Sequence, residues 1–177
     1  LTDGAFLLTD HQKQPVHGLS GYILVEVGTT LVHQTELGGL ARLRAAFPGA
    51  DGSERLLVEL GDGQTVESVL LPRAGLCVST QAGCAVGCRF CMTGRSGLLR
   101  QLGSAEIVAQ VVLARRRRTV SKVVFMGMGE PAHNLDNVLR ALEILCCTTR
   151  FDYSARKVTL STCGLVPEML EFGRRSH

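Results

Sequence analysis

The chain has 177 residues, of which 45% are hydrophobic and 20% are charged, proportions typical of a soluble globular protein with one core. Its longest apolar runs, such as VVFMGMG, are far too short to span a bilayer. Its first residues lack the basic-then-apolar order of a secretion signal. We therefore expect a cytoplasmic protein that is not embedded in a membrane.

Charge and cysteines narrow the function further. Residues 1–70 contain 4 Lys and Arg against 9 Asp and Glu, whereas residues 71–177 contain 15 against 7. The basic segment suits a polyanionic partner such as RNA, and equally a solvated surface that binds nothing. Seven cysteines, three of them clustered, favour a metal or catalytic site in a reducing compartment over a disulfide framework.

Residues 1–72 are expected to form a small accessory region rich in β-structure. GYILVEVG has the composition of a strand. The apolar spacing in ELGGLARLRAAFPG (36–49) predicts a helix that ends at the Pro-Gly pair. RLLVELGDGQTVESVLLP (55–72) predicts a β-hairpin in which Asp62 and Gly63 form the turn.

Residues 73–177 are expected to alternate strand and helix three times. The predicted strands are 76–80, 122–127 and 157–162, and the predicted helices are 104–118, 134–147 and a third that starts at 166. Ser104 is a plausible N-cap of the first helix, whose apolar residues fall largely on one side. This order predicts a parallel sheet with right-handed crossovers and ligands at the carboxyl ends of its strands.

The segment GCAVGCRFCMTG places Cys84, Cys88 and Cys91 in a glycine-rich loop after the first of these strands. Thiolates favour zinc or iron–sulfur clusters, and both usually take four protein ligands. No second cysteine pair or His-x3-His follows. Three cysteines would hold three corners of a four-iron cluster and leave one iron open to a further ligand. Buried structural thiols are the alternative interpretation.

Three sequence blocks carry a resemblance to a known family. LCVSTQAGCAVGCRFCMTG, VVFMGMGEPAHNLDNV and KVTLSTCGLVPEM resemble successive blocks of radical S-adenosylmethionine (SAM) enzymes and, more narrowly, of the RlmN/Cfr adenine methyltransferases of RNA. The resemblance covers about residues 64–170. It implies an α/β fold, with about three of the six units of a (β/α) radical-SAM barrel in residues 73–177 and residues 1–72 as a β-rich appendage.

The resemblance also implies the chemistry. Cys84, Cys88 and Cys91 would bind a [4Fe–4S] cluster, whose fourth iron chelates SAM through its amino and carboxylate groups. Reduction by a donor such as flavodoxin or ferredoxin would cleave SAM to a deoxyadenosyl radical. The product would be an adenine methylated at C2 or C8 in 23S rRNA, with tRNA as an alternative or additional target.

Five further residues match functional positions of the family. Gly129 and Glu130 in GMGEP match a pair that lies along the amino group of SAM, and Ser161 matches a serine that contacts the cofactor. Cys77 matches a second cysteine that helps to resolve the covalent enzyme–RNA intermediate, and Glu67 matches a proton acceptor. Without the family, they would be interpreted as a turn, a strand-end or cap serine, a buried thiol and an exposed strand residue.

Other features depart from the family or leave alternatives open. A methyl-carrying cysteine near the C-terminus has no counterpart, so we expect a partial chain that cannot methylate RNA alone. Cys163 is interpreted as a tolerated small residue. The run RRRR (115–118) would be a solvated helix end or a phosphate contact. A different radical SAM enzyme and a non-catalytic metal-binding RNA interaction module remain alternative functions.

Overall fold

The computed structural model describes residues 40–175 and, before them, four short strands. These are β1 (Leu8–Thr9), β2 (Pro15–Val16), β3 (Val25–Val27) and β4 (Thr30–Val32), which pair as β1–β2 and β3–β4. The strand predicted in GYILVEVG contains β3, and its other residues lie outside the described residues.

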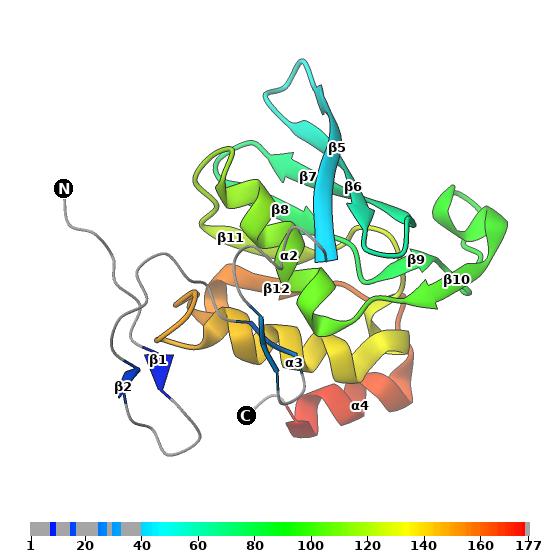
Figure 1. Ribbon diagram of the computed structural model, residues 1–177. Helices are drawn as coiled ribbons and strands as arrows, with labels where there is room; N and C mark the ends of the chain where they lie inside the picture. Colours follow the sequence, from blue (N-terminus) through cyan, green and yellow to red (C-terminus); the bar gives the residue numbers. More distant parts are fainter. Residues whose placement is uncertain (1–7, 10–14, 17–24, 28–29, 33–39, 176–177) are drawn as a thin grey trace.

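A six-stranded mixed sheet forms the centre of the molecule (Figure 1). Its order is β12 (Val158–Leu160), β11 (Lys122–Phe125), β8 (Gly75–Val78), β7 (Thr65–Leu71), β6 (Glu54–Leu60) and β5 (Ala41–Pro48). Strands β8, β11 and β12 are parallel, as predicted, whereas β5 to β8 form an antiparallel meander. The boundary proposed between residues 72 and 73 lies in the turn from β7 to β8, and one sheet continues across it.

The predicted hairpin is confirmed as β6 and β7. Gly63 occupies the turn with a φ of 84°, which glycine adopts without strain. The Asp62 carboxylate accepts a hydrogen bond from the backbone N–H of Gln64 at 3.0 Å, a local turn contact that Asp commonly makes.

The helix predicted over residues 36–49 is wrong for its described part, because residues 41–48 form strand β5. Ala, Leu and Arg are good helix formers, but intrinsic propensity is a small effect that pairing with a neighbouring strand overrides. Arg42 and Arg44 both bond the Glu59 carboxylate on β6, with Arg42 Nε 2.9 Å from Glu59 Oε1. The alternation of A-R-L-R-A was the available signal of a strand.

Helices α2 (Ser104–Arg115) and α3 (Leu135–Cys146) cover one face of the sheet, and α4 (Val166–Arg175) lies beside α3 (Figure 1). Helix α2 ends at Arg115 rather than at 118, and nine of its twelve residues are buried, so its packing is not one-sided. Its N-cap is Gly103 rather than Ser104; the backbone N–H of Gly103 donates to Glu106 Oε2 at 2.9 Å. The remaining helical turns are η1 (Thr93–Ser96), η2 (Pro131–Asn134) and η3 (Ala155–Lys157).

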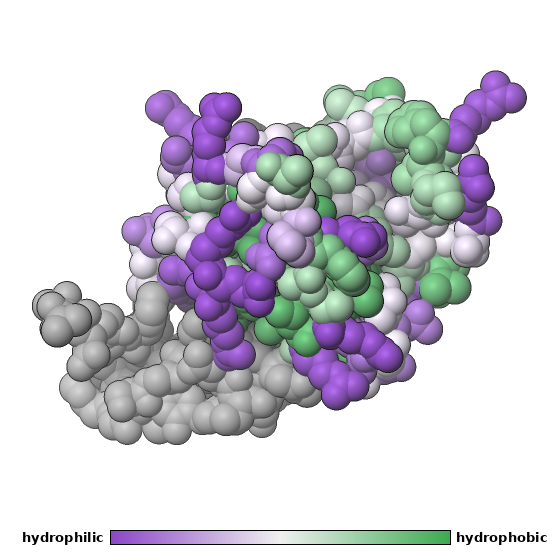
Figure 2. All heavy atoms as spheres, turned by 90° about the horizontal axis from the view of Figure 1, so that it is seen from above, coloured by the Kyte–Doolittle hydropathy of each residue, from purple (hydrophilic) through white to green (hydrophobic). Residues whose placement is uncertain are grey.

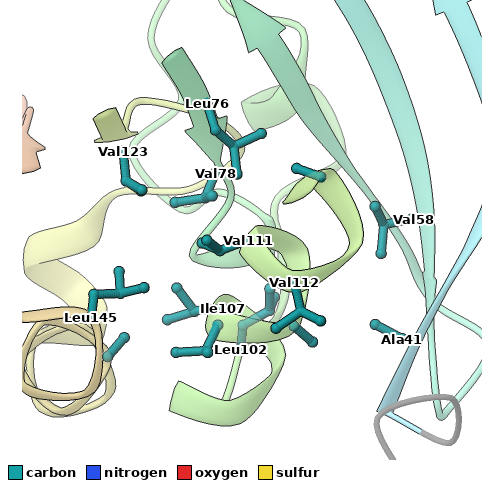
Figure 3. Close-up of a cluster of buried hydrophobic side chains, with 14 of the residues drawn as sticks. Ala41, Val58, Leu76, Val78, Leu102, Ile107, Val111, Val112, Val123 and Leu145 are labelled. Carbon is teal, nitrogen blue, oxygen red and sulfur yellow. The ribbon is translucent and has the colours of Figure 1, made fainter. Parts of the chain in front are cut away.

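The hydrophobic core lies between the sheet and helices α2 and α3 (Figure 3). Alternate strand residues such as Leu76 and Val78 pack against Ile107 and Val111 of α2. Within this core, Gln110 accepts hydrogen bonds from the Ser68 hydroxyl at 2.7 Å and from the Ser79 backbone at 2.9 Å. This buried amide ties α2 to the centre of the sheet.

The opposite face of the sheet carries the other set of alternate residues. Paired strand residues point to the same face, and the registers link Val69, Cys77, Val124 and Thr159 in one row. By alternation, Glu67 two residues before Val69 and Ser161 two residues after Thr159 belong to the same face. Among the described residues, no helix covers this face. In a (β/α) barrel the face away from the helices is the inner one, so we call it the inner face.

Helix α4 is the least embedded of the three helices. None of its residues is buried, and Val166, Met169 and Leu170 are between 48% and 62% exposed. A groove of about 660 Å³ separates α4 from α3 and β12. The edge strand β12 likewise has no buried residue.

The arginine run 115–118 largely serves the fold. Arg115 lies over the ring of Phe151, with its guanidinium carbon 5.4 Å from the ring centre, a favourable cation–π distance. Arg117 forms an ion pair with Glu54 of β6, with Nε 3.2 Å from Oε2. Neither of the two interpretations from sequence included these contacts.

Arg118 supports a testable prediction about this run. Its guanidinium donates to the backbone oxygens of Gly52 and Leu71, each at 3.0 Å. Arg118→Ala should lower the free energy of unfolding by about 1–3 kcal/mol, the range for hydrogen bonds to charged groups. Arg116→Ala, on an exposed side chain, should change it by less than about 0.5 kcal/mol. Equal midpoints of the two variants in urea unfolding would contradict this role of Arg118.

Candidate cluster and cofactor site

The site is built from three loops, each of which follows one of the parallel strands. The cysteine loop follows β8, GMGEP follows β11 and STCG follows β12. Parallel strands end at the same edge of a sheet, so their loops meet there. This arrangement agrees with the expectation from the sequence.

The cysteine loop is closed at its base by a strand pair that the sequence did not predict. Strand β9 (Gln81–Gly83) pairs antiparallel with β10 (Leu98–Gln101). Only three residues form β9, which is too short for an alternating pattern to be recognised. Further along the loop, a Cβ on Gly94 would lie 2.9 Å from the Cα of Gly87. The loop therefore folds back on itself at positions where only glycine fits.

The three cysteines of this loop are free thiols of intermediate exposure. The backbone N–H of Cys91 donates to the carbonyl of Cys88 at 3.0 Å. Hydrogen bonds from the hydroxyl and backbone N–H of Thr93 lower the pKa of the Cys91 thiol, which favours the thiolate that binds metals. Three thiols on a tightly folded glycine loop are a donor set that fits an iron–sulfur cluster. In residues 40–175, however, no three Cys, His, Asp or Glu side chains are gathered so as to hold a metal ion as they stand.

The cysteine loop also exposes apolar side chains. Phe90 is 92% exposed and Met92 69%, and Leu99 of the adjoining strand β10 is 60% exposed. Figure 2 shows hydrophobic residues beside hydrophilic ones at the end of the molecule where β9 and β10 lie in Figure 1. Arg89 and Arg95 are exposed in the same loop.

Glu130 joins the second loop to the third. Its side chain is almost fully buried, and its oxygens accept hydrogen bonds from the backbone N–H groups of Ala132 at 2.9 Å and Cys163 at 2.8 Å. Burial alone would raise the pKa of the Glu130 carboxyl, but bonds from the Thr162 hydroxyl, Cys163 and Ala132 outweigh it, so the pKa is lowered. The sequence interpretation assigned this carboxylate to the cofactor rather than to the fold, yet both of its oxygens already accept from the protein.

A contact inside the protein explains why residue 129 is glycine. Its φ is 99°, and an added Cβ would lie 2.5 Å from the Cβ of Gln81 and 2.6 Å from its Cγ. The buried side chain of Gln81 therefore fills the space that a side chain at position 129 would need. Its contact with SAM stays a prediction.

The third loop carries Ser161 and Cys163, which are both exposed. The backbone N–H of Ser161 donates to the carbonyl of Phe125 at 3.3 Å, which continues the ladder between β11 and β12. Desolvation, the Glu130 carboxylate and the nearby Cys88 thiol raise the pKa of Cys163. The predicted cofactor serine and the cysteine loop therefore lie at the same end of the sheet.

Cys77 and Glu67 lie on the inner face, close to the site. Cys77 is 9% exposed, and burial raises the pKa of its thiol. The Glu67 carboxylate accepts from Arg55 Nη1 at 2.8 Å, and its backbone N–H lies 3.3 Å from the sulfur of Met128. The structure thus brings Glu67 beside GMGEP, although 61 residues separate Glu67 from Met128.

Comparison with known proteins identifies the family. A family model described as "Radical SAM superfamily" matches residues 78–175 of this chain. The chain belongs to the radical SAM superfamily. The resemblance of the cysteine loop to this superfamily is therefore confirmed, and membership implies SAM and a [4Fe–4S] cluster as cofactors.

The relatives of this radical SAM chain are longer. A probable RNA methyltransferase of Leptothrix cholodnii is 72% identical over 129 residues, which are 73% of this chain and 37% of the relative. One of Stutzerimonas stutzeri is 80% identical over the same shares. The crystal structure of a radical SAM methyltransferase from Sphaerobacter thermophilus matches with a TM-score of 0.71 and 41% identity, over 76% of this chain and 42% of that one. The α/β fold with a parallel-strand sheet, similar to that of a radical SAM methyltransferase, is thereby confirmed.

Two further properties complete the description of this radical SAM chain. Within the described residues, no helix has both the length and the apolar character needed to cross a membrane.

Gln81 and Thr93 contact site residues, but the sequence analysis did not select them. An isolated Gln or Thr in a loop carries no chemical pattern, and its partner is visible only in the fold.

Proposed function

We propose that this radical SAM chain provides the cluster-binding and SAM-binding part of an RNA methyltransferase. Its target would be C2 or C8 of an adenine in 23S rRNA, with tRNA as an alternative or additional target. The names of the relatives support RNA as the substrate class. The chain spans 37% of their length, so the activity is proposed for the whole protein.

One observation carries the proposal. The cysteine loop, the GMGEP loop and the STCG loop meet at one edge of the sheet. There the backbone N–H of Glu130 donates to the Gln81 side chain, and the Glu130 carboxylate accepts from the backbone N–H of Cys163. A site that must hold a cluster and a cofactor beside each other needs this kind of convergence. We assign Cys84, Cys88 and Cys91 to the cluster.

We assign Gly129, Glu130 and Ser161 to SAM. Because the Glu130 carboxylate already accepts hydrogen bonds from the protein, the backbone of Gly129 and Glu130 is the group that remains to meet the amino end of the cofactor. When bound, the cluster would supply the electron that cleaves SAM. The chain's own residues would orient the cofactor and hold its amino-acid end.

The RNA would approach the inner face of the sheet. Cys77 and Glu67 share this face, and we assign them to resolution of the covalent intermediate and to proton acceptance. Arg55 bonds the Glu67 carboxylate, and Arg42 and Arg44 bond the carboxylate of Glu59 on the neighbouring strand β6. Arginines next to the proposed reacting groups suit an RNA backbone.

We further propose a flavodoxin or ferredoxin as electron donor and a cytoplasmic location. Arg89 and Arg95 in the exposed cysteine loop would suit an acidic redox partner. In this proposal, residues 73–177 are the first half of the barrel and residues 1–72 are an accessory region, whose strands β5 to β7 extend the sheet.

Anaerobic reconstitution tests the proposed function. The chain with added iron and sulfide should turn brown, bind SAM and form 5′-deoxyadenosine when reduced with dithionite. A colourless protein that binds zinc and leaves SAM intact would favour the non-catalytic RNA interaction module. Cleavage of SAM without methyladenine, in a chain as long as its relatives and supplied with rRNA, would favour a different radical SAM enzyme.

A further inference from the structure

Gln81 lies at the point where the cysteine loop, GMGEP and η2 meet. It is fully buried, it begins β9, and it precedes Cys84 by three residues. Its backbone N–H donates to the carbonyl of Met128 at 3.2 Å. Both the main chain and the side chain of Gln81 therefore contact GMGEP, while the chain that follows it leads into the cysteine loop.

The side-chain amide of Gln81 is the middle of a hydrogen-bond chain. Its oxygen accepts from the backbone N–H of Glu130 at 2.7 Å, and its nitrogen donates to the Gln101 side-chain oxygen at 2.8 Å. Gln101 in turn donates to the carbonyl of His133 at 2.8 Å. The backbone N–H of Glu130 can only donate, so the amide oxygen of Gln81 must face it.

No other side-chain type reproduces this pair of contacts at this length. Glutamate could accept from Glu130, but when ionised it could not donate to Gln101, and methionine could do neither. The aliphatic part of Gln81 also fills the space beneath Gly129, where a Cβ would be only 2.5 Å away. Gln81 thus fixes both the position and the direction of the Gly129–Glu130 peptide.

We propose that Gln81 is a positioning residue that sets the Gly129–Glu130 peptide relative to the cysteine loop. Because β9 runs directly into Cys84, any shift of the loop moves Gln81, and with it the peptide that we assign to SAM. The inference rests on the proposed function, since it assigns to this contact the coupling between cluster site and cofactor site. Gln81 itself would touch neither group.

The test compares two buried glutamines. Gln81→Met removes the amide and keeps the side-chain length. Gln110→Met is the matched control, because Gln110 is equally buried and also hydrogen-bonded through both ends of its amide, but its partners Ser68 and Ser79 do not belong to the Gly129–Glu130 peptide. Thermal unfolding measured for both variants accounts for any general loss of stability.

The reconstituted 177-residue chain and both variants are assayed for iron content and for SAM affinity by calorimetry. Gln81→Met should retain the iron of the unaltered chain and bind SAM at least about tenfold more weakly. In the unaltered chain, SAM should change the electron paramagnetic resonance spectrum of the reduced cluster. In Gln81→Met, the same change should require a higher concentration of SAM. Gln110→Met should keep SAM affinity whatever its melting temperature.

Three outcomes would overturn the inference. Unchanged SAM affinity in Gln81→Met would show that the amide does not position the peptide, while the proposed function would stand. Equal losses of SAM affinity in both variants would reduce Gln81 to a contributor to stability. An unaltered chain that takes up iron but does not bind SAM would reject the proposed function and the inference together.

Discussion

Replacing any one of Cys84, Cys88 and Cys91 with alanine should remove most of the iron that the chain takes up on anaerobic reconstitution. Two remaining thiolates would hold only two corners of a four-iron cluster, and the described residues offer no ready-made group of Cys, His, Asp or Glu as a substitute. Iron and sulfide analysis, together with visible absorption, measures the loss. Stability of the metal-free chain should change little, because all three thiols are only partly buried.

Cys77→Ala and Cys146→Ala are the matched controls for this experiment. Cys77 lies on the inner face of β8, and Cys146 ends helix α3, so both variants should retain the iron of the unaltered chain. If Cys77→Ala lost as much iron as Cys91→Ala, Cys77 would be a ligand and its assignment to RNA chemistry would be wrong.

Glu130→Gln should lower the free energy of unfolding by about 2–4 kcal/mol. The two N–H groups of Ala132 and Cys163 both point at carboxylate oxygens. A glutamine amide would turn its NH2 group toward one of these donors, and the ion would no longer strengthen the other bond. Urea unfolding of the metal-free chain measures this effect without any contribution from SAM.

Glu143→Gln is the control for Glu130→Gln. Its carboxylate is 65% exposed and pairs with Arg140 within α3, a contact that contributes less than about 0.5 kcal/mol. Equal stability of the two variants would mean that Glu130 does not hold the loops together. In that case the carboxylate would be available to the cofactor, as the sequence alone had suggested.

Local patterns in the sequence predicted much of the fold. The strand–helix order after residue 73 has a definite period, and the Asp62–Gly63 turn is a strong short-range signal. The three cysteines were recognisable because their chemistry depends on spacing along the chain. Each of these features is local, since the residues that define it lie close together in the sequence, so no knowledge of the tertiary structure was needed.

The features that were missed depend on distant partners. Strand β5 contains helix-favouring residues, and its pairing with β6 outweighs that preference. Gln81 and Glu130 are 49 residues apart, and neither shows by its neighbours that it bonds to the other. The carboxylate of Glu130 was assigned to a ligand because one of its internal donors, the N–H of Cys163, becomes apparent only once β11 and β12 lie side by side.

The shallow seating of α4 and β12 affects the order in which the site can open. Segments with little buried apolar surface exchange their amide hydrogens first, through local opening that leaves the rest of a domain intact. The STCG loop lies between these two segments, neither of which has a buried residue. Local opening there would release Cys163 from Glu130, while Gln81 and the cysteine loop stayed anchored to β8 and β11. The part of the cofactor site that carries Ser161 would then be the last to form on folding and the first to be lost, while the Gly129–Glu130 part stayed in place.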